Sequence, residues 1–170
     1  MKCAVCGGGL VHREGSHHYT ECGLDKVYLE GIDIAKCTKC REEFISLPRV
    51  PELHNFIGLT LIQKKTLLNG KEIRFFRKNL GLSSKKFAKY LSVNNATLSR
   101  WENDRQDLTL SHDRLIRIVY ASIKGLPVGK IKHFIEDEFI TIRSRKGTMR
   151  KTSIPVAKLN NGFASCLPAA

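Results

Sequence analysis

The sequence predicts a mainly α-helical protein with a small zinc-stapled β module at its N-terminus and a basic extension at its C-terminus. Three observations support this fold class. Two Cys-x2-Cys pairs lie within residues 1–40, a helix-turn-helix pattern spans residues 82–102, and positive charge gathers in the middle and at the end of the chain. Together they divide the chain into residues 1–46, 47–69, 70–125 and 126–170.

The charge of the chain favours a polyanionic partner. Of its 170 residues 42% are hydrophobic, which is enough for a core, and its formal net charge is +13. Residues 1–50 carry seven basic and seven acidic side chains, whereas residues 51–110 and 141–170 each carry a net +6. We therefore expect the middle and the end of the chain, and not its first third, to face nucleic acid.

The sequence gives no sign of a membrane or secretory segment. The chain begins with Met1–Cys6 rather than with a basic region followed by an apolar run. No apolar stretch reaches the ~20 residues needed to span a bilayer. We expect a cytoplasmic protein with reduced cysteines and no membrane partner.

Four cysteines have the spacing of a structural zinc site: Cys3, Cys6, Cys37 and Cys40. Two such pairs bring four thiolates into the tetrahedral arrangement that Zn²⁺ prefers. Disulfides and a redox-active Cys-x2-Cys motif are the alternatives. A reducing compartment disfavours the first, and the lack of a βαβ pattern disfavours the second. Because four cysteines close the coordination sphere, we expect one structural, non-catalytic Zn²⁺ per chain.

The remaining cysteines and the nearby histidines are not needed as ligands. We expect Cys22 to be a small packed residue or a free thiol and Cys166 to be an incidental thiol. Three histidines between the cysteine pairs are expected to be loop residues: His12, His17 and His18.

The segment between the cysteine pairs is expected to form a β-hairpin that turns at Glu30–Gly31. Residues 1–46 contain too few apolar side chains to hold themselves together, so metal binding should supply most of their folding energy. We expect chelation to unfold this module and to leave the helical domain intact. Leu47–Pro51 is predicted to be a linker, since two prolines disfavour helix, and residues 52–68 a connecting helix.

Four further helices are predicted, at residues 71–80, 84–91, 95–103 and 113–124. Ser83, Asn94 and Ser111 are expected to cap the last three of them. Gly81 and Gly125 stand where a helix C-terminus favours glycine. In the last helix, four apolar residues are expected to point inward: Leu115, Ile116, Val119 and Ile123.

The second and third of these helices form a helix-turn-helix motif. Its core is expected to consist of Ala88, Leu91, Val93, Leu98 and Trp101. The opposite face of the third helix is polar, as in helices that enter the major groove, although a solvated face in an all-α protein is the alternative. The predicted base contacts are Asn95, Ala96, Ser99 and Arg100. The predicted phosphate contacts are Ser84, Lys85, Lys86, Lys89, Asn103 and Arg105.

The basic C-terminal extension has a less specific pattern. Residues 131–138 are expected to form a short helix, and residues 139–145 and 148–155 flank Lys146–Gly147 in a predicted hairpin. Three roles stay open for this segment: a contact with the DNA backbone or minor groove, a dimerisation strand, or a poorly ordered tail.

The segments Ile73–Ser83 and Thr97–Glu102 are similar to the Xre/Cro-like helix-turn-helix family. With the two cysteine pairs before them, residues 1–125 resemble the MqsA-type (YgiT-type zinc finger) antitoxins of bacterial toxin–antitoxin systems. The resemblance implies that the zinc module binds and neutralises a toxin, commonly an mRNA-cleaving ribonuclease. It also implies a homodimer that represses its own operon at a palindromic operator.

Two features depart from that family. Its reading Asn and Arg are four residues apart, whereas here Ala96 stands four residues before Arg100 and Asn95 stands one earlier, which makes Arg100 the stronger candidate. The family's short members also lack the last 45 residues. The alternative function is a free-standing Xre-type regulator of a phage or mobile element. We expect no enzymatic activity, because no nucleophile–base pair, phosphate-binding glycine loop or open metal site stands out.

Overall fold

The computed structural model describes residues 1–47, 49–125, 136, 142–147 and 151–161. A β-rich N-terminal region precedes a set of helices, which confirms the predicted fold class. The elements in chain order are β1 (Leu10–His18), β2 (Val27–Cys37), β3 (Glu43–Ile45), α1 (Val50–Ile62), β4 (Thr66–Leu67), α2 (Gly70–Asn79), α3 (Ser84–Tyr90), α4 (Asn95–Glu102), α5 (Leu110–Ile123), β5 (Arg143–Lys146), β6 (Thr152–Pro155) and the 3₁₀ helix η2 (Val156–Asn161).

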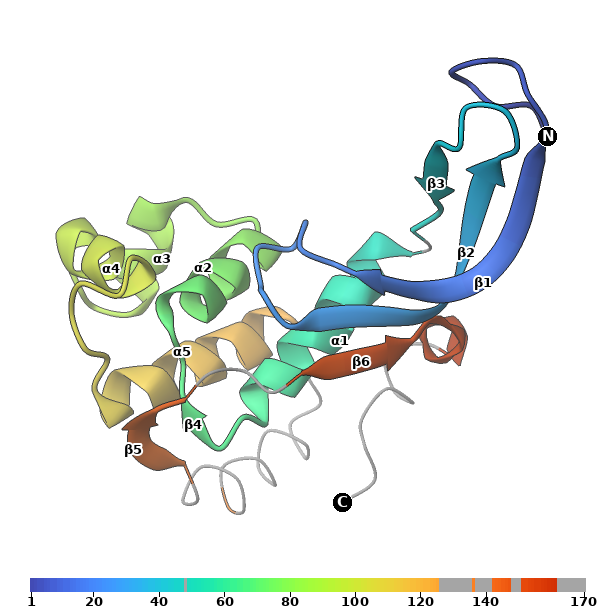
Figure 1. The fold of residues 1–170 in the computed structure, drawn as a ribbon. Coiled ribbons are helices and arrows are strands. Elements are labelled where there is room, and N and C mark those ends of the chain that lie inside the picture. Colours follow the sequence, from blue (N-terminus) through green and yellow to red (C-terminus); the bar gives the residue numbers. More distant parts are fainter. Residues whose placement is uncertain (48, 126–135, 137–141, 148–150, 162–170) are drawn as a thin grey trace.

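Residues 1–46 form an N-terminal arm that reaches away from the helices (Figure 1). Strands β1 and β2 pair antiparallel along the arm, and β3 adds to the second half of β2. The N-terminus and the end of β2 lie together at the far tip (Figure 1). Both cysteine pairs are therefore at the point of the arm most distant from α3 and α4.

Gly31 forms a bulge in the arm and not a hairpin turn. Strand β2 runs unbroken through it, and the register shifts there, with Gly15 opposite Ile32 and Ser16 opposite Glu30. Gly31 is left unpaired with a φ of 70°, a conformation that glycine adopts at low cost. The turn predicted at this glycine is wrong, because the local pattern of a bulge resembles that of a turn. The actual hairpin joins β1 to β2.

The C-terminal extension pairs with strands far away in sequence. Strand β6 lies parallel to the first half of β2, and β5 lies parallel to β4. The hairpin predicted around Lys146–Gly147 is wrong, because each strand has a partner elsewhere and the buried Ile154 and Leu159 fix β6 and η2 in the core. Apart from residue 136, the helix expected at residues 131–138 lies outside the described residues, as does Cys166.

Helix α1 begins and ends earlier than the apolar pattern predicts. It starts at Val50, so that Pro51 lies in the first turn, where its missing N–H breaks no helical hydrogen bond. It ends at Ile62, and Leu67 and Leu68 are buried after it without being helical. Within the described residues, no helix combines the length and apolar character that crossing a bilayer demands.

Helices α2 to α4 agree with the prediction to within a residue or two. Ser83 caps α3 and Asn94 caps α4, each through a side-chain oxygen that accepts a backbone N–H. The start of α2 also has a capping box, which the pattern did not predict. There Asn69 accepts the N–H of Glu72, and the Glu72 carboxylate accepts the N–H of Asn69.

Helix α5 begins at Leu110, three residues before the predicted start, and its cap lies two residues before the expected Ser111. Its cap is Thr109, whose hydroxyl accepts the backbone N–H of His112. Among the four residues expected to point inward, only Ile116 is fully buried, while Ile123 is 42% exposed. The buried face is rotated because it includes two charged residues, Asp113 and Arg117, that an apolar pattern does not register.

The base of the arm and the helices share one hydrophobic core. Tyr19 and Leu29 from the arm belong to the same buried cluster as Leu53 and Ile57 of α1. The Tyr19 hydroxyl also lies 2.8 Å from His54 Nε2, on the adjoining turn of α1. The arm is therefore packed at its base, and only its tip projects.

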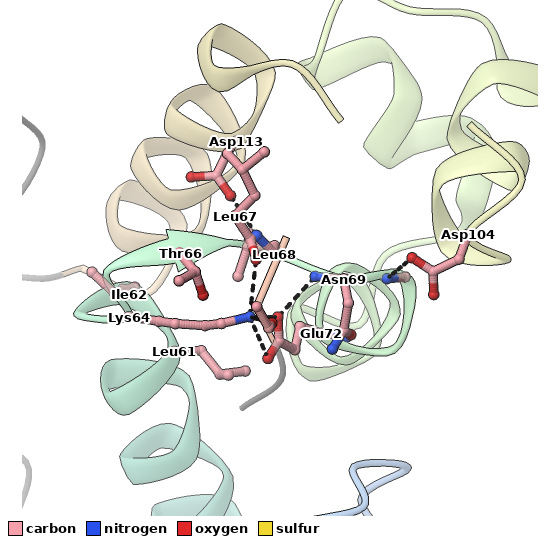
Figure 2. A network of polar contacts seen from close by, with 12 residues as sticks. Leu61, Ile62, Lys64, Thr66, Leu67, Leu68, Asn69, Glu72, Asp104 and Asp113 are labelled. Carbon is pink, nitrogen blue, oxygen red and sulfur yellow. Dashed lines mark hydrogen bonds and ion pairs between the residues drawn. The ribbon is translucent and has the colours of Figure 1, made fainter. Parts of the chain in front are cut away.

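A buried polar network joins the end of α1, β4 and the start of α2 to α5 (Figure 2). Its centre is the fully buried Arg117, which donates to the carboxylate of Asp113 at 2.8 Å. Arg117 also donates to four backbone carbonyls at 2.6–3.1 Å, those of Leu61, Ile62, Lys64 and Thr66. One side chain of α5 thus bonds to two carbonyls in the last turn of α1 and to two in the segment that follows it.

Lys64 forms the second half of this network (Figure 2). Its ammonium lies 2.7 Å from the fully buried carboxylate of Glu72 and donates to the carbonyl of Leu67 at 2.9 Å. It also donates to the carbonyl of Gly147 at 2.7 Å. A Cβ on Gly147 would lie 2.5 Å from the Thr66 hydroxyl oxygen, so glycine alone allows this approach. The C-terminal segment is therefore anchored to the start of the helix-turn-helix region.

Candidate metal centre and nucleic-acid interface

The two cysteine loops at the arm tip have the same backbone structure. In the first, the N–H of Gly7 donates to the carbonyl of Cys3 at 2.9 Å, and in the second Arg41 donates to Cys37 at 3.1 Å. The N–H of each leading cysteine also bonds to the carbonyl five residues later, at 2.8 and 2.9 Å. Both loops therefore aim two thiols toward a common centre.

The four sulfurs meet in one cluster. All four Sγ atoms lie within 4.8 Å of one another, with 3.6 Å between Cys3 and Cys40 and 3.4 Å between Cys6 and Cys37. A tetrahedral Zn²⁺ with Zn–S bonds of about 2.3 Å sets its sulfurs about 3.8 Å apart. The cluster thus fits a four-coordinate metal ion with small adjustments. Cys3 and Cys37 are buried and Cys40 is exposed, so the site lies at the surface of the tip.

The thiols of this cluster ionise unequally. The backbone N–H of Glu42 lowers the pKa of the Cys40 thiol, but hydrogen bonds with the sulfurs of Cys6 and Cys37 outweigh it and raise that pKa to about 12. The backbone N–H groups of Cys40 and Lys39 hold the pKa of the Cys37 thiol at about 6, below its usual value. The amide of Lys39 lies 3.4 Å from that sulfur. An easily ionised thiol binds a metal with less competition from protons.

Gly8 lies directly against the sulfur cluster, and replacing it with alanine is expected to weaken metal binding. A Cβ there would lie 3.0 Å from Cys37 Sγ and 2.9 Å from Lys39 Cβ. We expect Gly8→Ala to lower metal affinity roughly 10- to 100-fold, as changes beside a metal site commonly do. Competition with a chromophoric chelator measures this. Gly9→Ala is the control, because its Cβ would have 3.8 Å of clearance, and equal affinity of both variants would contradict the prediction.

Arg41 is strained at the position where the first loop has Gly7. Both residues have left-handed backbones, with φ of 63° and 70°, which a non-glycine residue adopts at a cost of about 1–2 kcal/mol. We expect Arg41→Gly to raise metal affinity by up to about tenfold. Isothermal titration of the metal-free chain with metal measures the gain. Arg41→Ala removes the charge but keeps the strain, so an equal gain in that variant would assign the effect to charge.

The other thiol and the histidines of the arm lie apart from the cluster. The half-buried Cys22 thiol lies 3.5 Å from the carbonyl of Tyr19, as expected for a packed residue. The histidines are on strand β1 rather than in loops, a correction that follows from the length of that strand. His12 pairs with Asp33 at 2.9 Å, and His17 pairs with Glu21 at 3.3 Å.

The helix-turn-helix core assembles as the sequence predicts. Ala88, Leu91, Leu98 and Trp101 are at most 3% exposed, and Val93 packs half-buried against them. The turn between the helices contains Ser92 at a φ of 55°. Helices α3 and α4 are thereby fixed relative to each other by apolar contacts on the faces turned away from solvent.

Glu102 and Gly70 attach α4 to α2. The nearly buried Glu102 carboxylate receives two hydrogen bonds from Arg77, at 2.6 and 2.9 Å. This pairing raises the pKa of the Arg77 guanidinium. A Cβ on Gly70 would lie 2.6 Å from the carbonyl oxygen of Trp101, so α2 starts directly against the end of α4. The Trp101–Glu102 pair therefore sets the angle at which α4 is presented.

The outer face of α4 is polar and open. The four predicted base contacts, Asn95, Ala96, Ser99 and Arg100, are all exposed on this face. The Ser84 hydroxyl lies 2.6 Å from Asn95 Oδ1, so it orients that amide from the first turn of α3. The exposed face of α4 thus rests on a packed core, and Ser84 holds the amide of Asn95 in one orientation.

Comparison with known families agrees with this geometry. Residues 73–112 match the helix-turn-helix family model HTH_3. These residues form an Xre-type helix-turn-helix domain. No curated protein and no solved structure matches the chain. The Xre-type domain is a DNA-binding domain of transcriptional regulators, and the match runs from within α2 through α3 and α4 to the start of α5.

Most of the predicted phosphate contacts of the Xre-type domain are exposed around α3 and α4: Lys85, Lys86, Lys89 and Arg105. Asn103 differs, because both ends of its side chain are engaged within the protein. Its Oδ1 accepts from Arg74 at 2.8 Å, and its Nδ2 donates to the carbonyl of Ser99 at 2.7 Å. These contacts make Asn103 a cap of α4, a role that its position after the helix could have suggested.

Proposed function

We propose that this chain is a transcriptional repressor that acts as a type II antitoxin in the bacterial cytoplasm. Its Xre-type domain binds a palindromic operator as a homodimer, and its arm holds and neutralises a partner toxin. The proposal rests on one observation. A single hydrophobic core joins the Xre-type domain to the four-cysteine arm, and apolar side chains are exposed at the tip of that arm. Met1, Val5 and Val11 are 95%, 68% and 58% exposed there. These exposed apolar side chains are the ones that we propose to contact the toxin.

The metal of the arm is proposed to be Zn²⁺, one ion per chain. Among the residues that the structure describes, the four cysteines alone make up the cluster, and four thiolates form a closed tetrahedral set that suits a structural ion and leaves no position for a reacting water. Elemental analysis of the purified chain tests this. One zinc per chain is expected, and iron in its place would overturn the choice of metal.

Sequence readout is proposed to rest on Arg100, with Asn95 beside it. Arginine commonly pairs with guanine through two hydrogen bonds, and Arg100 is exposed in the last turn of α4. Ala96 and Ser99 are short, which lets the helix sit deep in the groove. Ser84 holds the oxygen of Asn95 and leaves its amide N–H groups to donate to a base. Dimerisation would set two such helices one helical turn of DNA apart.

Arg100→Ala is expected to weaken operator binding by roughly 5- to 150-fold, the equivalent of about 1–3 kcal/mol for a lost base contact. Fluorescence anisotropy with an operator duplex and a scrambled duplex at one salt concentration measures the loss. Binding to the scrambled duplex should change much less. The control is Lys89→Ala, which should weaken both duplexes alike. If Arg100→Ala weakens binding to both duplexes equally, Arg100 contacts a phosphate and not a base.

The antitoxin part is tested by the product of the neighbouring gene. We expect that protein to copurify with the chain and to lose the interaction when Val5 or Val11 is replaced by Asp. Operator affinity should stay unchanged, since neither residue touches the Xre-type domain. Ile123→Asp, also at an exposed apolar residue, is the control. If no neighbouring product binds the arm, the alternative function stands, a free-standing Xre-type regulator whose arm has another role.

A further inference from the structure

A basic hollow runs along the outer side of α3. Its volume is about 540 Å³, and it is lined by Ser83, Lys85, Lys86, Lys89 and Tyr90. Because Phe87 and Ala88 are buried on the opposite side, the helix cannot turn this face away. The side chains that line the hollow therefore stay on the solvent side of α3, beside α4.

The charges around this hollow are of one sign. Lys85 and Lys89 stand one turn apart on α3, a spacing at which like charges repel and weaken a helix. The first turn of α3 contains no acidic residue. A polyanion lying in the hollow would remove this repulsion, and the nearest polyanion to a reading helix is the backbone of the bound DNA.

Tyr90 is an unusual member of this lysine-rich surface. It is 46% exposed although it is one of the largest side chains, and its hydroxyl has no hydrogen-bond partner within the described part of the chain. The ring adds little to the core, because the buried residues of α3 are Phe87 and Ala88. The phenol is therefore free to act on whatever fills the hollow.

We propose that Tyr90 is a DNA-backbone contact of the Xre-type domain. Its hydroxyl donates to a phosphate oxygen that Lys86 and Lys89 hold in the hollow, and its ring lies against the adjoining sugar. Tyrosine hydroxyls are among the groups that contact phosphates in protein–DNA complexes. The proposal rests on the proposed DNA binding and adds to it a neutral contact that the lysine pattern does not predict.

The test is a salt series of DNA binding with the full chain and a duplex of about 20 base pairs of arbitrary sequence. Tyr90→Phe keeps the ring and removes only the hydroxyl, and we expect affinity to fall roughly tenfold. The slope of log affinity against log salt should stay the same, because a neutral donor releases no counterion. Lys89→Gln should instead reduce the slope by about 0.9.

Tyr28→Phe is the matched control, because it removes a phenol hydroxyl from the arm, where the ring stacks on His18. Its DNA affinity should equal that of the unchanged chain. If Tyr90→Phe also binds with unchanged affinity, the proposal is overturned while DNA binding stands. If both Tyr90→Phe and Lys89→Gln leave affinity and slope unchanged, the hollow faces something other than DNA, such as an acidic protein, and the proposal is again overturned. Failure of the unchanged chain to bind any duplex would instead reject the proposed function itself.

Discussion

Replacing Arg117 with methionine is expected to lower the free energy of unfolding by about 3–5 kcal/mol, the cost of breaking a buried ion pair from one side. Methionine has a similar length and fills much of the space, so the effect is electrostatic rather than a cavity. The variant leaves the carboxylate of Asp113 buried without its cation. It also removes one donor from each of four carbonyls, at the end of α1, in the segment after it and in β4.

Urea denaturation followed by Trp101 fluorescence measures this loss, because Trp101 is 3% exposed in the folded chain. Arg105→Met is the control, since Arg105 is exposed, and its effect should stay within about 0.5 kcal/mol. In the double variant with Asp113→Leu, the losses should be less than additive because the unpaired charge is gone. A single-variant loss below about 1 kcal/mol would show that water replaces the guanidinium.

Removing the metal is expected to unfold the tip of the arm and to leave the helices folded. The tip gathers few buried apolar side chains, so the cysteine loops depend on the ion for their stability. The base of the arm differs, because Tyr19 and Leu29 are packed in the core shared with α1. The boundary of unfolding should therefore lie within β1 and β2 and not at residue 46.

Hydrogen exchange with and without chelator locates that boundary. The amides of Gly7 and Arg41, which bond to Cys3 and Cys37, should lose protection, whereas those of α2 and α4 should keep it. Cys40→Ser should reproduce the effect of chelator, and Cys22→Ser should not. Loss of protection throughout the helices would mean that the ion stabilises the whole protein, and unchanged exchange at the tip would mean that the loops fold without metal.

Much of the candidate site follows from local sequence. The cysteine spacing predicted the sulfur cluster, and the caps Ser83 and Asn94 predicted α3 and α4, because these features depend on residues within a turn or two of one another. The exposed face of α4 was also predictable, because the period of a helix places Leu98 on the buried face and Ser99 on the exposed one. The identity of the metal, the partner of the arm and the DNA contacts stay proposals.

The errors in the prediction share a physical cause. Gly31 looks like a turn until its cross-strand partners are known, because a bulge is defined by two strands. Strands β5 and β6 look like a hairpin until their distant partners are known. The inward face of α5 was predicted from its apolar residues alone, and only the carbonyls of α1 and β4 explain why Arg117 is buried there.

The sequence by itself determined a four-cysteine loop pair and an Xre-type reader, because each depends on short-range spacing and capping. Tertiary structure alone decided that the two form one body. The C-terminal strand β6 completes the sheet of the arm, and Gly147 binds Lys64 beside the start of α2. Such contacts join residues more than eighty positions apart, and their free energy comes from burial and hydrogen bonds that no local pattern records.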